Sequence, residues 1–237
     1  MNSGKTKYML VRGIRKELRG NTTVRCLDGN EIERVEVIKY LGIIIDDRLK
    51  FSGHCDYMLK KIGKKISFLN RIGNFISAYT RCTIYKTIIA PHFEYCATLL
   101  LDMGDTQLSR LQKAQNRAMR VILQCDRRTK VKCMHQALQF MTIRQRLYYN
   151  TCIFIFKILN NMMSEQFSNR LRIVEGERET RQTGDIVIEF RKTRSAQKSL
   201  FYEGVLMYNA LPPEVKHCNR LEMFKRMLKE FVFNDVT

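Results

Sequence analysis

The stretch "KYLGIIIDDRLKF", residues 39–51, marks the point at which the chain changes from strands to helices. Its apolar half is rich in β-branched residues, which is typical of a strand, and Asp46 and Asp47 stand where that run ends. From Ser52 onward, isoleucine and leucine recur at three- and four-residue spacing, which predicts a helix. The stretch therefore predicts strands on its N-terminal side and helices on its C-terminal side.

The predicted fold class is α+β, mainly α. Short antiparallel strands over residues 7–45, arranged around the turn-forming Asp28-Gly29-Asn30, are followed by a helical bundle and a small C-terminal α region. The fourth helix is apolar on most sides, so we expect it to be the buried centre of the helical part. The periodicity places helices from Ser52 to about 76, over 80–90 with a stop near Pro91, from an Asp105 cap to about Gln124, over 142–161 and over 220–232.

The chain also changes composition along its length. After Asn161 the pattern loosens, and residues 174–199 are polar and charged apart from "DIVIEF", which alternates like a short strand. We therefore expect five segments: strands over 1–51, a helical region over 52–135, a buried helical connection over 136–173, a loop or linker with a short strand over 174–199, and a C-terminal helical region over 200–237.

The charge is strongly positive and unevenly distributed. Lysine and arginine outnumber aspartate and glutamate by 42 to 23, which gives a net charge of +19. Between Arg48 and Lys132 there are 17 basic and five acidic residues, and from Tyr57 to Phe93 there is no acidic residue. Such a balance favours polyanionic partners, nucleic acid above all.

The eight cysteines are scattered rather than densely spaced, so we interpret them as reduced thiols of a protein in the cytoplasm or nucleus. No apolar run is long enough for a signal peptide or a membrane span, which predicts no membrane association.

Several apparent motifs are weak. "SGKT" at 3–6 lacks the earlier glycine and the preceding strand of a phosphate-binding loop. Cys125, Cys133 and His135 fit no zinc-ligand spacing, and we interpret them as two buried thiols beside a surface histidine. The four histidines lie in no nucleophile signature. The sequence predicts no metal site.

Asp46 and Asp47 could bind metal ions for nucleotidyl transfer. Two-metal chemistry needs carboxylates from separate strands, and Asp28 is the only aspartate upstream. We therefore interpret the pair as a strand-end turn whose carboxylates are solvated or paired with Arg48 and Lys50, and we predict no catalytic residue.

Five stretches, in this order along the chain, resemble the C-terminal part of the reverse transcriptases of non-LTR retrotransposons, the LINE-type elements of the jockey-like kind. They are "NSGKTKYMLV" (2–11), "VIKYLGIIIDDRLKF" (37–51), "LQFMTIRQRLYYNTCIFIFKILNN" (138–161), "TRSAQKSLFYEGVLMYNALPPEV" (193–215) and "MFKRMLKEFVF" (223–233).

The resemblance implies that Tyr40, Leu41 and Gly42 form the centre of the primer grip and that the helices from Ser52 onward form the thumb. For Tyr40 the alternative is a core tyrosine. It implies too that the catalytic aspartates, on an aromatic-x-Asp-Asp turn, would lie just before Met1. The intact enzymes use Mg²⁺, but for this chain alone the resemblance implies no cofactor and no polymerase activity.

The expected partners are RNA and DNA as template–primer, bound with little sequence preference, and the missing polymerase portion. Cationic stripes on the first long helix and on the helix at 105–124 suit phosphates, although a solvated face is the alternative for either stripe. The candidate nucleic-acid-binding residues are Lys60, Lys61, Lys64, Lys65, Arg110, Lys113, Arg117, Arg120, Arg127 and Arg128.

Three interpretations of the function follow. The first is a truncated RNA-directed DNA polymerase that binds template–primer through a basic thumb without polymerising. The second is a domesticated helical module that binds protein. The third is a non-functional transposon remnant, whose N-terminal strands have lost the palm sheet and expose an edge.

Overall fold

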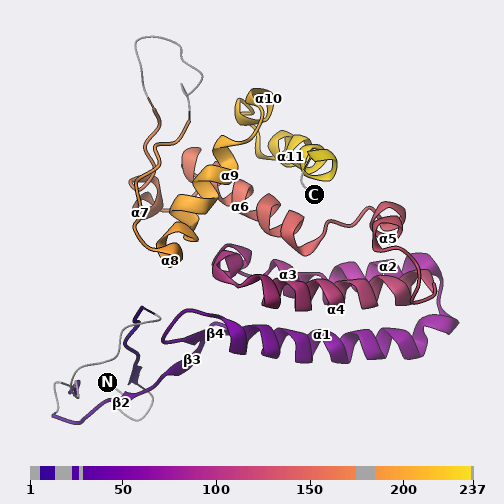
Figure 1. Cartoon of the computed structure of the whole chain (residues 1–237), viewed down its shortest axis with the longest axis horizontal. Coiled ribbons are helices and arrows are strands. Elements are labelled where there is room, and N and C mark those ends of the chain that lie inside the picture. The colour runs from indigo at the N-terminus through magenta and orange to yellow at the C-terminus, as the bar shows by residue number, and fades with distance from the viewer. Residues whose placement is uncertain (1–5, 14–22, 27–28, 175–184, 236–237) are drawn as a thin grey trace. The chain divides into compact units, whose positions relative to one another are not determined.

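The computed structural model describes residues 6–13, 23–26, 29–174 and 185–235. The chain divides into two compact units, residues 1–61 and 62–237, and the boundary falls inside the longest helix (Figure 1). Two short strand pairs lie in the first unit and helices dominate the second, which confirms the α+β, mainly α class. Most of "SGKT" (3–6) and Asp28 lie outside the described residues.

The strands are β1 (Lys7–Tyr8), β2 (Glu33–Arg34), β3 (Val37–Tyr40) and β4 (Ile43–Asp46). The helices of the N-terminal and central parts are α1 (Ser52–Ile72), α2 (Ala78–Ile84), α3 (Pro91–Glu94), α4 (Asp105–Leu123), α5 (Val131–Leu138), α6 (Ile143–Leu159) and α7 (Glu165–Ser168). The C-terminal helices are α8 (Arg194–Gln197), α9 (Val205–Asn209), α10 (Pro213–Lys216) and α11 (Leu221–Asp235). Shorter 3₁₀ or π turns are η2 (Gly73–Phe75), η3 (Tyr85–Ile89), η4 (Ala97–Asp102) and η5 (Leu200–Gly204).

In the first unit, one strand pair is antiparallel and the other is parallel. β3 and β4 form a hairpin in which Ile38 pairs with Ile45. β1 and β2 pair in parallel, with Lys7 opposite Glu33, so the prediction of antiparallel strands is wrong for this pair. Parallel strands need a crossover of about a dozen residues or more, and residues 9–32 supply it. Within that segment Arg25 and Glu31 form a single antiparallel bridge, on either side of the predicted turn.

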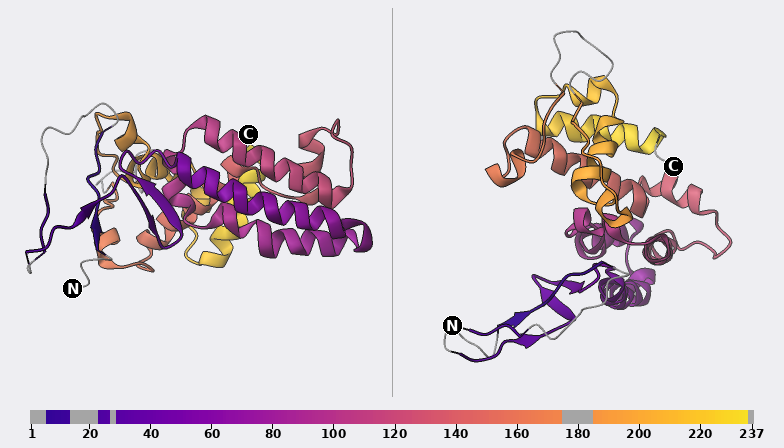
Figure 2. Two further views of the ribbon diagram at one scale, coloured as in Figure 1. Left: turned by 90° about the horizontal axis from the view of Figure 1, so that it is seen from below. Right: turned by 60° about the vertical axis from the view of Figure 1, so that its left-hand side comes forward.

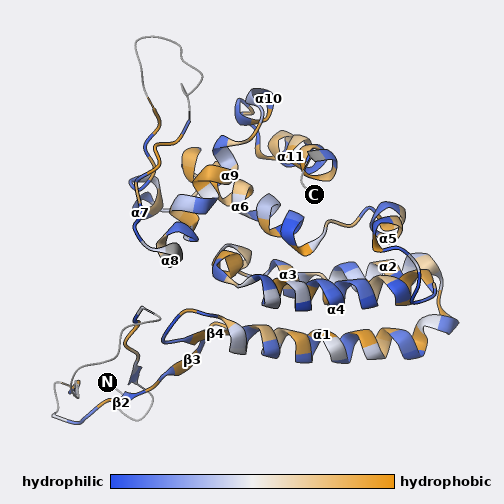
Figure 3. Ribbon diagram, viewed as in Figure 1, coloured by the Kyte–Doolittle hydropathy of each residue, from blue (hydrophilic) through white to orange (hydrophobic). Residues whose placement is uncertain are grey.

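In the second unit, α6 is the centre of the C-terminal helices, as its sequence predicts. It buries seven side chains, from Ile143 to Ile158, and it begins at a capping box between Thr142 and Gln145. The views in Figures 1 and 2 show α9 and α11 beside it, and Figure 3 shows that it is hydrophilic near its N-terminal end and mostly hydrophobic toward its C-terminal end. An aromatic ring of α6, Phe156, stacks on a ring of α11 with centroids 4.2 Å apart.

The segment "DIVIEF" forms no regular strand in the described residues. A single antiparallel bridge joins Ile173 to Ile186, and the side-chain amide of Asn209 holds the backbone of Ile186 at both N and O. None of the described helices is both long and apolar enough to cross a membrane.

The predicted helix over 80–90 continues past Pro91 instead of stopping there. The backbone N–H of Ala90 donates to the carbonyl oxygen of Tyr85 at 2.8 Å, which is the hydrogen bond of the π turn η3. Pro91 then occupies the first turn of α3, where its missing N–H costs nothing. The helix α5 was not predicted, because it is only eight residues long and buries one side chain, Met134.

Arg81 of α2 is buried and connects three segments of the second unit. Its Nε donates to the carbonyl oxygen of Ile122 at 2.8 Å, and its Nη1 donates to those of Gly73 at 2.6 Å and Ile76 at 3.0 Å. Ile122 lies in the last turn of α4 and Gly73 directly follows α1. The carboxyl end of a helix favours a cation, so these carbonyl groups stabilise the buried guanidinium without a carboxylate.

We expect Arg81→Met to lower the free energy of unfolding by about 2–5 kcal/mol, because it removes a donor that three buried or half-buried carbonyl groups share. Chemical denaturation followed by circular dichroism measures the loss. Arg71→Met, on the exposed side of α1, is the matched control and is expected to change stability by no more than about 0.5 kcal/mol. Equal effects of the two variants would refute the connecting role of Arg81.

Candidate nucleic-acid interface

The helix α4 carries one apolar and one cationic side. It begins after Gly104, which is the N-cap in place of the predicted Asp105, and Asp105 instead forms an ion pair with Arg144 at 2.6 Å. Its buried side chains are Leu108, Leu111, Gln115, Ala118, Met119 and Ile122. The four predicted cations lie away from that row: Arg110, Lys113 and Arg117 are exposed and Arg120 is half-buried.

The chain reverses directly after α4. Gln124 has a φ of 49°, in the left-handed region, and its side-chain amide donates to the carbonyl oxygen of Gly73 at 3.3 Å and to Oδ1 of Asn74 at 2.9 Å. Asp126 accepts a hydrogen bond from the backbone N–H of Arg128 at 3.0 Å, which shapes the following turn. The reversal brings Arg127 back toward the cationic side of α4.

A pocket of about 400 Å³ results, and three arginines line it. None of its lining residues is acidic. The Nε of Arg120 is buried and has no hydrogen-bond partner within the described part of the chain. Such a concentration of guanidinium groups is chemically suited to phosphate oxygens, which accept paired hydrogen bonds from arginine. The lining residues are Asn70, Gly73, Asn74, Arg117, Arg120, Val121, Gln124, Cys125 and Arg127.

The predicted lysines of α1 do not all remain available. In the first unit, the ammonium of Lys61 lies 4.5 Å from the ring centroid of Tyr57, and Lys60 is exposed. In the second unit, Lys65 donates to the carbonyl oxygen of Ile88 at 3.0 Å and contacts Nε2 of His92 at 2.5 Å, whereas Lys64 is exposed. Contacts within the protein therefore occupy two of these four cations.

The predicted primer grip is the turn of the β3–β4 hairpin. Leu41 and Gly42 have φ angles of 45° and 86°, the two positive values that a tight type I′ hairpin turn requires. Tyr40 is 61% exposed and Leu41 is 73% exposed. Tyr40 is therefore no core residue of this chain, and its contact with a primer stays a prediction.

Asp46 and Asp47 hold the backbone of the turn into α1. Asp46 accepts hydrogen bonds from the backbone N–H groups of Arg48, Lys50 and Phe51 at 2.8–3.1 Å, and Asp47 forms an ion pair with Arg12 at 2.8 Å. The sequence interpretation left these carboxylates solvated or paired with Arg48 and Lys50. In the structure Asp46 binds the backbone N–H groups of those two residues, and Asp47 pairs with Arg12.

These two carboxylates do not fit the Mg²⁺ of the intact enzymes, because protein donors already engage both of them. Across the described residues, no group of three or more histidine, cysteine or acidic side chains could hold a metal ion.

The cysteine and histidine group at 125–135 also differs from its prediction. Cys133 is exposed, and Cys125 is half-buried. His135 is half-buried rather than on the surface, and its Nδ1 lies 2.7 Å from the carbonyl oxygen of Phe140. Burial lowers the pKa of His135, which favours the neutral ring. All eight cysteines are free thiols.

Sequence reasoning missed Arg81. It donates a hydrogen bond to the carbonyl oxygen of Gly73, which lines the pocket of Arg117, Arg120 and Arg127. A signal was present: Arg81, Tyr85 and Ile89 recur at four-residue spacing, and all three are buried. A single cation in such an apolar row points to a buried charge.

Known proteins similar to this chain are transposon polymerases. No protein family model and no solved structure matches it. It is 30% identical to the probable RNA-directed DNA polymerase from transposon X-element of Drosophila melanogaster over 108 residues, 44% of this chain and 12% of that protein. It is 27% identical to the probable RNA-directed DNA polymerase from transposon BS of the same species over 128 residues, 53% of this chain and 14% of that protein.

About half of the chain is therefore related in sequence to transposon reverse transcriptases. The two matches confirm the resemblance to the enzymes of non-LTR retrotransposons, whereas its placement in their C-terminal part stays a prediction. They cover only a small fraction of either relative's length, so the relatives' activity and partners enter below as proposals.

We expect the double variant Arg117→Glu, Arg127→Glu to weaken binding to nucleic acid at least tenfold and to flatten its salt dependence. The slope of log K against log salt is about −0.9 per phosphate neutralised on B-form DNA, so each lost contact reduces it. Fluorescence anisotropy over a salt series measures both quantities. The control, Arg220→Glu with Arg226→Glu, changes two exposed arginines by the same charge. Equal losses would show that the net charge of +19 acts diffusely.

We expect Asp46→Ala to destabilise the turn into α1 by about 1–3 kcal/mol, because three backbone donors lose their acceptor. Leu49 and Phe51 have φ angles of 52° and 55° there, which a side chain disfavours. Hydrogen exchange at the amides of Lys50 and Phe51 reports the opening. Asp46→Asn keeps one acceptor oxygen and is expected to lose less; unchanged exchange in Asp46→Ala would contradict this role.

Proposed function

We propose that the chain is the primer-grip, thumb and C-terminal part of a reverse transcriptase and that it binds template–primer nucleic acid. The basic face, defined as Arg110, Lys113, Arg117, Arg120 and Arg127, contacts the phosphate backbone. The observation that carries the proposal is a pocket whose lining holds three arginines and no acidic residue, in a chain similar to transposon polymerases.

Phosphate contacts position a protein on a duplex without reading its bases. The chain therefore binds RNA–DNA and DNA duplexes with little sequence preference. Arginine suits this role better than lysine, because its planar guanidinium can donate two parallel hydrogen bonds to one phosphate. In this proposal Tyr40, Leu41 and Gly42 contact the primer strand and the exposed cations at 60, 64 and 128 add to the electrostatic attraction.

The chain alone does not polymerise in this proposal. Asp46 and Asp47 are engaged by backbone N–H groups and by Arg12, so neither is available to a catalytic metal ion. The catalytic aspartates and the Mg²⁺ that they bind belong to the polymerase portion that the chain would serve.

A second candidate function is protein binding by the helical part. Two aromatic side chains support it, since Phe75 is 87% and Tyr79 is 82% exposed. Large exposed aromatic groups are typical of the centre of protein interfaces. Phe75→Ala with Tyr79→Ala would separate the functions: a protein partner would be lost, whereas phosphate contacts through the basic face would remain.

We expect no primer extension by the purified chain on RNA or DNA template with Mg²⁺ or Mn²⁺, and measurable binding of the same template–primer in the anisotropy assay. A gel-based extension assay with radiolabelled primer makes the test. Extension that disappears in the double variant Asp46→Asn, Asp47→Asn would overturn the non-catalytic part. Absence of template–primer binding at low salt would overturn the binding part.

A further inference from the structure

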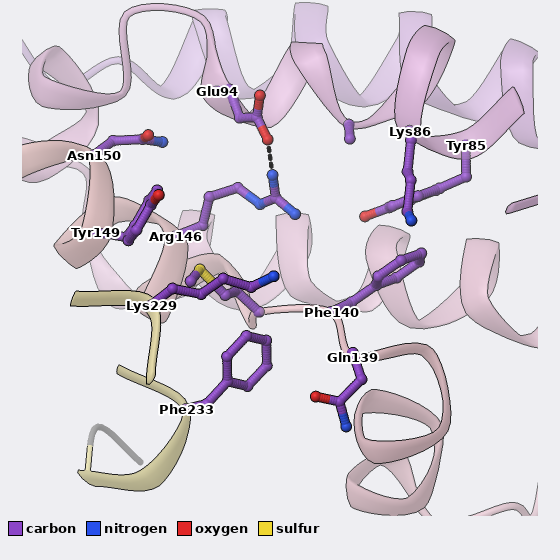
Figure 4. Close-up of a pocket in the computed structure, with 12 residues that line it drawn as sticks. Tyr85, Lys86, Glu94, Gln139, Phe140, Arg146, Tyr149, Asn150, Lys229 and Phe233 are labelled. Atoms are coloured by element: carbon purple, nitrogen blue, oxygen red, sulfur yellow. Dashed lines mark ion pairs between the residues drawn. The ribbon is translucent and has the colours of Figure 1, made fainter. Parts of the chain in front are cut away.

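A second pocket of about 360 Å³ lies within the helical unit, and it shares no residue with the basic face. Figure 4 shows its interior: side chains of α6 and α11 meet those of η3 and α3 and the segment that precedes α6. The lining residues are Tyr85, Lys86, Ala90, Glu94, Gln139, Phe140, Met141, Arg146, Tyr149, Asn150, Lys229 and Phe233.

The pocket holds more positive than negative charge. Arg146, Lys86 and Lys229 face a single acidic group, Glu94, which already forms an ion pair with Arg146. In Figure 4 the guanidinium of Arg146 and the ammonium of Lys229 both point into the same space. Cations that converge in this way repel one another, so an anion between them lowers the energy.

Two residues that line the pocket each have a buried polar atom without a hydrogen-bond partner in the described part of the chain. Nε of Arg146 and Nδ2 of Asn150 are both buried, and neither makes a hydrogen bond to any described residue. A buried donor without an acceptor costs about 1–3 kcal/mol, which is why such groups are rare. The side chain of Arg146 is only 14% exposed, so the fold holds it in place at this cost.

The hydroxyl group of Tyr85 adds a further donor. Nε2 of Gln115 donates to the Tyr85 oxygen at 3.2 Å, which leaves the hydroxyl proton for another acceptor. Burial raises the pKa of Tyr85, so the hydroxyl group stays protonated. In Figure 4 it points toward the guanidinium of Arg146.

Aromatic rings form much of the remaining wall. The ammonium groups of Lys86 and Lys229 lie 5.9 Å from the ring centroids of Phe140 and Phe233. Phe140 is stacked on Tyr85, whereas Phe233 is half-buried. A phosphate group alone would leave most of the volume empty, and a cavity of roughly 300–1,000 Å³ lined partly by aromatic rings is the usual size for a drug-sized ligand.

We propose that this pocket binds a nucleoside phosphate, with the phosphate between Arg146, Lys86 and Lys229 and the base against Phe233 and Tyr149. Base stacking on aromatic side chains and phosphate pairing with cations are the two interactions that this chemistry offers. The ligand can be a free nucleotide or the phosphorylated end of a strand. The proposal does not rest on the basic face, so either can fail alone.

The test uses the full chain in isothermal titration calorimetry with adenosine monophosphate, adenosine and inorganic phosphate. We expect adenosine monophosphate to bind at least tenfold more tightly than the other two. Lys86→Met with Lys229→Met is expected to reduce that affinity at least tenfold. Lys225→Met, a lysine of α11 outside the pocket, is the control and leaves the affinity unchanged. Equal thermal midpoints of the variants exclude unfolding.

Two further titrations with oligonucleotides distinguish a free nucleotide from the phosphorylated end of a strand as the ligand. A short single strand with and without a 5′-phosphate is titrated into the Arg117→Glu, Arg127→Glu background, which suppresses backbone binding. A 5′-phosphorylated strand that binds more tightly than adenosine monophosphate identifies a strand end, and the reverse order identifies a free nucleotide. No binding of either at millimolar concentration, or binding that Lys86→Met with Lys229→Met leaves unchanged, overturns the proposal.

Discussion

The pocket lined by Arg117, Arg120 and Arg127 depends on the hydrogen bonds of the buried guanidinium of Arg81. The guanidinium joins the carbonyl oxygens that follow α1 to one in the last turn of α4, so it fixes Gly73 and Asn74 against the helix that carries Arg117 and Arg120. A buried cation is costly unless its donors are satisfied, and here three carbonyl groups accept from it. Without Arg81, the carbonyl groups at these helix ends would be buried without a hydrogen-bond donor, so the guanidinium and the carbonyl groups satisfy one another.

In the first unit, Asp46 has the opposite chemical role: it accepts hydrogen bonds from backbone N–H groups instead of donating to carbonyl groups. Its carboxylate satisfies three backbone N–H groups where the chain leaves β4 and enters α1, through residues with positive φ. A pair of acidic residues at a strand end resembles a metal site, yet a carboxylate that accepts several backbone hydrogen bonds is already engaged by the fold. Whether such a carboxylate binds a metal ion or accepts hydrogen bonds from the backbone depends on where the backbone N–H groups lie. The order of residues alone does not reveal that.

The long periodic elements could be predicted from the sequence, and the local reversals could not. The spacing placed α1, α4 and α6 within a few residues, because each buries a continuous apolar row, whereas α5, the π turn η3 and the parallel pairing of β1 leave no such pattern. Spacing likewise placed Arg117 and Arg120 on one side of α4. That Arg127 joins them depends on the left-handed conformation of Gln124, a conformation that glycine or asparagine usually adopts at a helix end. The amide of Gln124 stabilises it through Gly73, 51 positions away, so no local pattern could indicate the reversal.

Two arginines in separate pockets, Arg120 and Arg146, are held by the fold in the same way. The Nε atom of each is buried without a partner among the described residues, while the rest of the guanidinium lines a pocket. Holding a long side chain in one conformation costs rotamer entropy. For Arg120 and Arg146 this entropy is lost when the protein folds, before any ligand binds. An exposed lysine such as Lys64 loses its freedom only when it binds. In both proposals, affinity for an oxyanion is therefore concentrated at these two arginines, because their binding requires the least further loss of entropy.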